Sequence, residues 1–461
     1  MRHKSELRPY QDRIGTFLYE HDEAMCVLRP GGGKTVTALT AIEELLRDKV
    51  IRHALVVAPK RVARVVWPDE IKLWSHLWDL RYEVLDGSPM QRQRQLATAG
   101  ERQLTIVGID VMQWLLDALA GQLDDHPLFD LLVIDEISRL RNARGSRAKA
   151  LAKRAGDWGM VWGLTGTLRP SSAQDLFMPA RIVTRGKLWG ASFDGWRQRH
   201  FHPVDYQGYD WQPMPTMEDK LNAEIAPLIT TAGEGELKQP TPTVVIDRIK
   251  LPTQVMHQYD EMHRRLAVSL SGTTIVAASA GVATGKLAQI SNGFMYNEDK
   301  SVIRLHNDKR EWLEDVIQNA TGPTLLVYDF NEDLRMIRDA LGEEVPYLGA
   351  GVSNAQADNT IKLWNEGRLP FMALHPASGG HGLNLQAGGA DMAWIAPTWS
   401  PEFWEQTIAR LNRSGQPRQV VVRVCVAENT VDELKLSRVH YKMTAQESFE
   451  SYLRRWQQRA A

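Results

Sequence analysis

Cysteine and long apolar runs are both scarce in this chain. Cys26 and Cys425 are its two cysteines and lie far apart, so neither a disulfide framework nor a CxxC zinc site is expected within it. That usage suits a reducing cytosol. No apolar run approaches the roughly 18 residues that suggest a membrane-spanning helix, and residues 1–11 lack the apolar stretch of a signal peptide. We therefore expect a cytoplasmic protein that does not enter a membrane.

An excess of charge of either sign is also missing. The 461 residues include 55 Lys and Arg against 56 Asp and Glu, which gives a formal net charge of −1. The molecule is therefore not a polycation, and any contact with nucleic acid must come from local basic patches. A chain of this length is too long for one core and long enough for two or three domains.

Short apolar segments alternate with helical patterns in both halves, which predicts βαβ units on parallel sheets. In the first half we expect helices at 34–46 and 62–74 and strands at 24–28, 54–58, 104–107, 131–134 and 161–164. In the second half we expect a helical stretch at 254–294 and strands at 324–327, 371–374, 392–395 and 420–426. Between them, 203–243 is rich in Pro and predicts a junction. The chain thus reads as an α/β protein with two tandem lobes, 1–240 and 241–461.

A glycine-rich loop lies between an expected strand and an expected helix. Residues 31–35 read Gly-Gly-Gly-Lys-Thr, and glycines let backbone N–H groups close on phosphate oxygens at the positive end of a helix. In such a loop Lys34 would reach the β- and γ-phosphates, and the Thr35 hydroxyl would ligate Mg²⁺. Leu28 stands where the full phosphate-loop motif has its first Gly, so a plain glycine turn is the alternative.

Two acids end the apolar strand at 131–134. A parallel strand would deliver Asp135 to magnesium at its carboxyl edge, where ligands of open α/β sheets bind. Glu136 would then polarise the water that attacks the phosphate. Many strands end in acids, but this pair stands between the glycine-rich loop and Thr165-Gly166-Thr167. That order favours a catalytic role.

Two arginines lie far downstream of the lysine. Arg410 and Arg413 are spaced i, i+3, which predicts that they share one face of a helix starting near Pro401. Guanidinium groups on a γ-phosphate accelerate hydrolysis by roughly 10³–10⁵ in well-studied NTPases. A single nucleotide-binding domain has no use for arginines so remote, whereas two lobes with ATP in the cleft between them do. A solvated basic face is the alternative.

Together these stretches resemble the superfamily-two helicase core of the Swi/Snf DNA-translocase type over nearly the whole chain. The likeness includes the glutamine motif at 7–11, motif Ia at 55–59 with Trp67, Glu70 and Trp74 after it, motif II at 135–142, motif III at 164–167, motif IV at 325–328, motif V at 378–385 and motif VI at 410–416. The resemblance implies two RecA-like lobes. It also implies that Gln11 reads adenine and that Gly31, Gly32, Gly33 and Gly382 lie around the nucleotide.

Three residues depart from the family pattern. Ser138 and Asn412 each stand where the family has His, and Leu168 stands where it has Pro. The first departure implies a different coupling of hydrolysis to motif III. The modules and large insertions of chromatin remodellers are not evident, and the compact form resembles versions from bacteriophages and bacteria. It implies work in replication, recombination or repair, in bacterial or phage-infected host cytoplasm.

Nucleic-acid contacts are expected from local basic segments. Residues 139–154 carry seven cations and no acid, including Arg144 and Arg147. Lys60 and Arg61, after motif Ia, form a second candidate. Such patches can follow a phosphate backbone, although a solvated helix flank looks the same in sequence. No motif for reading bases in sequence is present.

The resemblance implies a DNA-dependent ATPase/helicase that couples ATP hydrolysis to movement on DNA, with ATP and Mg²⁺ as cofactors and Lys34, Asp135, Glu136, Arg410 and Arg413 as catalytic residues. Duplex or branched DNA is favoured over RNA by the Gly-Leu-Asn-Leu and Arg-Ser-Gly-Gln stretches. We expect a monomer. Two alternatives stay open: an RNA helicase, and a DNA-binding motor subunit that serves a partner nuclease or replication protein.

Overall fold

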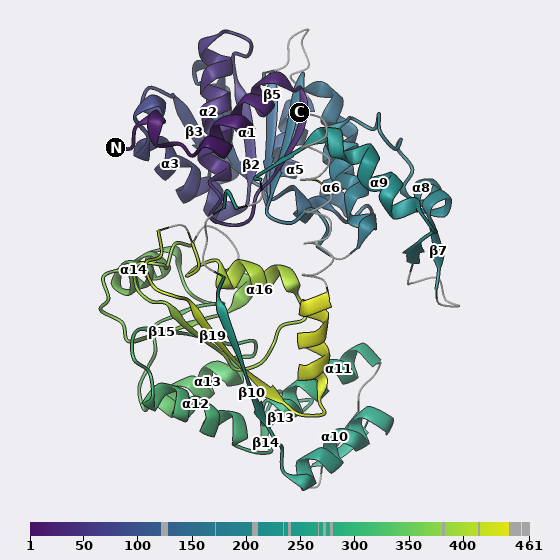
Figure 1. The fold of residues 1–461 in the computed structure, drawn as a ribbon, viewed down its shortest axis with the longest axis vertical. Helices are drawn as coiled ribbons and strands as arrows, with labels where there is room; N and C mark the ends of the chain where they lie inside the picture. Colours follow the sequence, from purple (N-terminus) through teal and green to yellow (C-terminus); the bar gives the residue numbers. More distant parts are fainter. Residues whose placement is uncertain are drawn as a thin grey trace. The chain divides into compact units, whose positions relative to one another are not determined.

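The structure is a computed structural model that describes residues 1–120, 128–170, 172–204, 211–233, 235–237, 241–265, 267–270, 273–276, 280–379, 383–413, 415–441 and 453. The chain divides into two compact units (Figure 1). The first is Met1–Lys238 together with Thr444–Ala461, and the second is Gln239–Met443. The assignment of 444–461 differs from the expected C-terminal lobe of 241–461. Leu453 accounts for it among the described residues, because it is buried in the core of the first unit.

A parallel sheet forms the centre of the first unit, in the strand order β3-β4-β2-β5-β6-β1-β9. Its strands are β1 (Glu23–Val27), β2 (Ala54–Ala58), β3 (Tyr82–Leu85), β4 (Leu104–Gly108), β5 (Leu131–Asp135), β6 (Met160–Thr165) and β9 (Ile229–Thr231). The five predicted strands are confirmed within two residues. β9 lies inside the segment predicted to be a loop-rich junction. With three residues, it is too short to show a pattern in the sequence.

Helices cover both faces of this sheet (Figure 1). One face packs against α1 (Pro9–Glu20), α2 (Lys34–Arg47) and α3 (Trp67–Leu73). The other packs against α5 (Met112–Ala120), α6 (Ser146–Arg154) and α7 (Phe177–Val183). Beyond these lie α4 (Pro89–Ala97), α8 (Phe193–His200), α9 (Met217–Ile225) and a hairpin of β7 (Phe201–Pro203) and β8 (Trp211–Pro213).

The prediction of a helical stretch at 62–74 is confirmed as far as Leu73, with a change of helix type inside it. A π-helical turn occupies Val62–Val66, and α3 begins at Trp67. Pro68 lies inside this continuous helical stretch and has no N–H with which to bond a carbonyl of the preceding turn. The change of helix type therefore falls directly before Trp67.

The second unit also has a parallel sheet, in the order β10-β19-β18-β15-β17-β16. Its strands are β10 (Thr243–Ile249), β15 (Thr324–Val327), β16 (Tyr347–Leu348), β17 (Phe371–Leu374), β18 (Asp391–Trp394) and β19 (Val421–Ala427). α12 (Asp308–Gln318) and α13 (Asn331–Leu341) cover one face. The other face packs against α14 (Asn354–Asn365), α16 (Pro401–Ile408) and the helical residues 431–441, and the short α15 (Pro376–Gly379) lies beside α16. The predicted α/β lobes with parallel sheets are thus confirmed.

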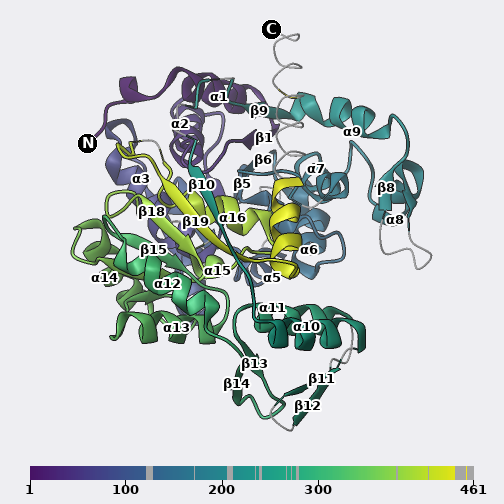
Figure 2. The ribbon, with the colours of Figure 1, turned by 60° about the horizontal axis from the view of Figure 1, so that its bottom comes forward.

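The helical stretch predicted at 254–294 is interrupted by strands (Figure 2). α10 (Thr253–Arg265) and α11 (Ala280–Ser291) are helices, but β11 (Ala267–Leu270) and β12 (Thr273–Val276) pair as an antiparallel hairpin between them. A second hairpin, β13 (Phe294–Tyr296) with β14 (Val302–Arg304), follows α11. The run Thr-Thr-Ile-Val in β12 is β-branched throughout and favours a strand. None of the described helices is long and apolar enough to cross a membrane.

Candidate nucleotide site

Three neighbouring strands of the first unit bring the predicted residues to one edge. β5, β6 and β1 are adjacent and parallel, with Thr165 opposite Val27 and Asp135 opposite Leu164. Parallel strands end on the same side of a sheet, so the glycine-rich loop after β1 meets Asp135 and Glu136 at the end of β5. Thr165, the last residue of β6, lies between them. The site therefore follows from strand order.

The glycine-rich loop needs its glycines for shape. Gly31 and Gly33 both have φ of 82°, in the left-handed region, and Gly33 is the N-cap of α2. A Cβ on Gly33 would lie 2.0 Å from Nε2 of Gln11. The Gly32 carbonyl accepts hydrogen bonds from the Tyr10 hydroxyl at 2.9 Å and from Gln11 Nε2 at 3.3 Å. α1 thus holds the loop backbone where a helix N-terminus can take an anion.

Gly33→Ala is expected to weaken nucleotide binding about tenfold. The new Cβ would collide with Gln11, and a left-handed backbone costs a residue other than Gly about 1–2 kcal/mol. Gly156→Ala is the matched control, because no atom of a neighbour lies within 4 Å of its added Cβ. Fluorescent-nucleotide titration of both purified variants is the measurement. A Gly33 variant that binds nucleotide like the control would refute this account of the loop.

Gln11 contacts the loop through its side chain. Its Oε1 accepts a hydrogen bond from the Arg8 backbone N–H at 2.9 Å, and its Nε2 donates to the Gly32 carbonyl. Only 8% of the residue is exposed. The amide therefore fastens the start of α1 to the loop in this structure, and adenine reading by Gln11 stays a prediction.

The Lys34 side chain lies between the glycine-rich loop and the acidic pair at the end of β5. Its Nζ donates to the Leu28 carbonyl at 2.9 Å and lies 3.9 Å from Glu136 Oε1. Both side chains are mostly buried, with exposed fractions of 11% and 15%. An ammonium group with a single distant carboxylate has donor capacity for an anion. This is the arrangement that binding of a phosphate requires.

Asp135 is buried, with 4% of its surface exposed. Burial and then the charge of Glu136 raise the pKa of Asp135 to about 6, against the opposing influence of Lys34 and Trp67. Its Oδ2 accepts a hydrogen bond from Trp67 Nε1 at 2.9 Å. The resemblance groups Trp67 with motif Ia and does not predict this contact with Asp135. A buried carboxylate whose pKa is raised in this way would be stabilised by a cation.

Hydroxyl groups connect Glu136 with the turn after β6. Thr165 Oγ1 lies 3.4 Å from Glu136 Oε2 and 3.1 Å from Ser138 Oγ. It also lies 3.0 Å from the Thr167 carbonyl. A hydroxyl has one proton, so Thr165 can donate to one of these acceptors at a time while Ser138 donates to it. Glu136 itself has φ of 57°, a left-handed conformation that is uncommon for Glu.

Oxygen donors at this edge fit a magnesium ion. The Thr35 hydroxyl and the Asp135 carboxylate are hard ligands, and Mg²⁺ commonly takes only one or two from protein. Burial is the main cause that raises the pKa of Asp135, so a cation beside this carboxylate would favour its charged form. Among the described residues, no group of three or more His, Cys, Asp and Glu could hold a metal, so a magnesium ion here would rely on these two protein ligands.

The two arginines of the second unit do not share a helix face, and that prediction is wrong. α16 ends at Ile408, and the N–H groups of Arg410 and Leu411 bond carbonyls three residues back in a tighter turn. Arg410 is buried, and its guanidinium donates to the carbonyls of Gln406 at 2.9 Å and Leu383 at 3.2 Å. Arg413 is half-buried, and its Nε donates to the Ala409 carbonyl at 2.8 Å. Gly382 lies outside the described residues.

Comparison with known proteins decides the family. The sequence matches the SNF2-related domain over residues 10–307. The chain belongs to this family. It is 30% identical over 459 residues to a protein of Acyrthosiphon pisum secondary endosymbiont phage 1, across 95% of this chain and 97% of that protein.

Two more distant relatives complete the comparison. The chain is 24% identical over 450 residues to the transcription regulatory protein SNF2 of Saccharomyces cerevisiae, across 90% of this chain and 26% of that protein. It thus spans about a quarter of that relative's length. A solved structure of the Sulfolobus solfataricus SWI2/SNF2 ATPase core in complex with dsDNA is 19% identical, with a TM-score of 0.44, across 98% of this chain and 94% of that one.

The basic segment of this SNF2-family chain is only partly available to a ligand. α6 buries Ala148 and Leu151. The exposed cations of the segment are Arg139, Arg144, Arg147, Lys149 and Lys153. Arg154 instead bonds Asp157 and, at 2.8 Å, the Leu116 carbonyl, so it belongs to the fold. Arg144 is 71% exposed and lies 3.6 Å from Asp194, an ion pair that water and salt weaken.

The second basic candidate follows β2. Lys60 is 60% exposed and lies 4.0 Å from Asp110, whereas Arg61 is half-buried. Lys60 is thus accessible to a phosphate backbone, with Arg61 less so.

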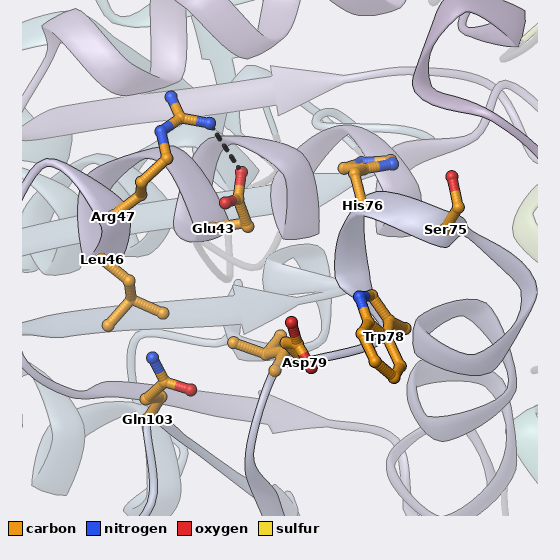
Figure 3. Close-up of a pocket in the computed structure, with 9 residues that line it drawn as sticks. Glu43, Leu46, Arg47, Ser75, His76, Trp78, Asp79 and Gln103 are labelled. Carbon is orange, nitrogen blue, oxygen red and sulfur yellow. Dashed lines mark hydrogen bonds and ion pairs between the residues drawn. The ribbon is translucent and has the colours of Figure 1, made fainter.

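A cavity in the first unit does not coincide with this site. It is lined by Glu43, Leu46, Arg47, Ser75, His76, Trp78, Asp79, Leu80 and Gln103 (Figure 3). Glu43, Leu46 and Arg47 belong to the last turns of α2, whereas Lys34 is its first residue. A helix rises 1.5 Å per residue, which separates the cavity from the loop by about 15–20 Å. We therefore locate the nucleotide site by its charged groups and not by this cavity.

Proposed function

We propose that this protein is a DNA-dependent ATPase that moves along DNA as it hydrolyses ATP. The observation that carries the proposal is the meeting of Lys34, Asp135 and Glu136 at one sheet edge, beside a glycine-rich loop, in a chain of the SNF2-related family. A plain glycine turn would not require an ammonium group 3.9 Å from a mostly buried carboxylate. Phosphate binding and water activation give both groups a use.

The site residues of the first unit have separate proposed roles. Loop N–H groups and Lys34 bind the phosphates, and Thr35 with Asp135 would hold Mg²⁺, which when bound neutralises phosphate charge. Glu136 acts as the base for the attacking water. Because its carboxylate lies near both the Lys34 ammonium and the Thr165 hydroxyl, it is oriented from two sides. Thr165 in turn links Glu136 to Ser138, in place of the histidine of the wider family.

Arg413 is proposed to complete the site from the second unit. Separate compact units are expected to move relative to each other, and closure on ATP would let Arg413 meet the γ-phosphate. Arg410 is assigned a supporting role here, because its guanidinium already ties the end of α16 to the Leu383 carbonyl. Arg410 is thus proposed to hold the turn that presents Arg413, and its role at the phosphate stays a prediction.

DNA is the proposed track. The SNF2 relative is named as a transcription regulator, and the solved SWI2/SNF2 core is described as a complex with dsDNA. The phage relative, matched over 97% of its length, supports a phage or bacterial setting, and replication, recombination or repair of DNA is the role that we propose there. Lys60 and Arg61 with the exposed cations of 139–154 would follow the DNA backbone without reading bases.

Replacing Arg144 and Arg147 together with Ala is expected to lower the salt dependence of duplex binding. Each lost phosphate contact removes about 0.9 from the slope of log affinity against log salt, so the change is about 2 units on any DNA sequence. Arg47→Ala with Lys187→Ala is the control, since these exposed residues carry the same charge. Fluorescence anisotropy over a salt series gives the slopes. Equal slopes for the two double variants would show that the patch is merely solvated.

A further inference from the structure

Trp67 contacts the carboxylate that the proposed function assigns to the cation. Its side chain is fully buried, with 0% exposed, and its Nε1 lies 2.9 Å from Asp135 Oδ2. The two residues are far apart in sequence, and the contact crosses from the first residue of α3 to the last residue of β5. It is thus a tertiary contact of the site.

An indole N–H is suited to fixing a carboxylate. It donates one hydrogen bond and cannot accept one, so it can only pair with the oxygen. The ring has little freedom, because Trp67 lies at the junction of the π-helical turn Val62–Val66 with α3 and is enclosed in the core on this face of the sheet. Rotation of the Asp135 carboxylate is therefore restricted by a rigid donor. Groups that orient metal ligands in this way commonly set the affinity for the metal.

We propose that Trp67 is a positioning residue that holds the Asp135 carboxylate for a divalent cation. The inference rests on the proposed function and adds a residue to the site. Trp67 does not touch the nucleotide or the cation in this account. It acts through Asp135, by holding one oxygen so that the carboxylate meets the cation in one orientation.

The simpler reading is that Trp67 only fills the core, and the chain offers a matched comparison. Trp162 is also fully buried, in the same core, and its Nε1 donates at 2.9 Å to the His21 carbonyl. Trp67→Phe and Trp162→Phe each remove one buried indole and the one hydrogen bond that its N–H donates. They differ in the acceptor that is left behind, a carboxylate in one case and a backbone carbonyl in the other.

The test is Mn²⁺ binding to the full chain with a non-hydrolysable ATP analogue, followed by the electron paramagnetic resonance signal of free Mn²⁺. Trp67→Phe is expected to weaken Mn²⁺ binding about tenfold, as typical for loss of a partner of a metal ligand. Trp162→Phe is expected to bind Mn²⁺ like the wild type. Equal Mn²⁺ affinity in the two variants would overturn the role of Trp67.

Two further measurements separate loss of the Trp67 hydrogen bond from a folding defect and from failure of the proposed function. Benzothienylalanine at position 67 keeps the ring shape but has sulfur in place of N–H. Weakened Mn²⁺ binding by this variant, with an unchanged unfolding midpoint, supports the proposal even where Trp67→Phe disturbs folding. Wild-type Mn²⁺ affinity in that variant would contradict the proposed role of Trp67. Failure of the wild type itself to bind Mn²⁺ with nucleotide would count against the proposed function, which separates the two failures.

Discussion

Glu136→Gln is expected to lower ATP turnover at least a hundredfold while nucleotide still binds. A positioned general base contributes about 10²–10⁴ in rate. The amide has the size of the carboxylate and keeps the contacts with Lys34 and Thr165 within reach, but it cannot take a proton from water. Steady-state ATPase assays with saturating DNA, beside titration of a fluorescent nucleotide, measure the two effects separately.

Lys34→Ala provides the contrast. Its Nζ joins the loop to the acids, so its loss removes a phosphate contact and leaves Glu136 without its cationic neighbour. Nucleotide affinity and turnover should therefore both fall. Glu83→Gln on β3 is the control, because this carboxylate pairs with Arg102 away from the loop. Turnover near wild type in either the Glu136 or the Lys34 variant would refute the assignment.

Arg413→Ala is expected to lose most DNA-stimulated turnover, by about 10³ or more. DNA favours the closed form because it binds that form more tightly than the open one. Without Arg413, closure brings no guanidinium group to the γ-phosphate. ATP and DNA should bind almost normally. Arg413→Lys should restore little activity, because a point charge does not reproduce the planar guanidinium fork. ATPase assays across a duplex titration give the stimulation directly.

Two other arginines separate this role from a structural one. Arg418→Ala removes an exposed arginine from the same region and should leave stimulation intact. Arg410→Ala should instead destabilise the second unit, since it leaves two buried carbonyls without a donor. An Arg413→Ala protein that keeps its stimulation, or loses it only because ATP no longer binds, would exclude action across the units.

Strands were predicted well where the side chains are buried on both faces. β2 and β5 read as continuous apolar runs and are buried throughout. β3 is only partly buried and β9 has three residues, so neither gave a comparable signal. The change from π-helical to α-helical bonding at Trp67 depends on hydrogen bonding around Pro68, which periodicity does not report.

The site was predictable as far as strand order determines it. Asp135 ends a strand, Lys34 and Glu136 come after strands, and adjacent parallel strands place them together. Contacts made by residues from other elements were missed, namely Tyr10 on Gly32 and Trp67 on Asp135. The turn at Arg410 was missed for the same reason, because its partner Leu383 is distant in sequence. Tertiary contacts of this kind leave no local pattern.

The central claim is tested most directly by ATP turnover with duplex DNA, single-stranded DNA and RNA side by side, at equal nucleotide concentration. The account predicts low turnover without polymer, strong stimulation by duplex DNA and little by RNA, all of it absent in Glu136→Gln. Stimulation by RNA alone would contradict DNA as the track. Turnover that no nucleic acid changes would contradict a DNA-dependent motor altogether.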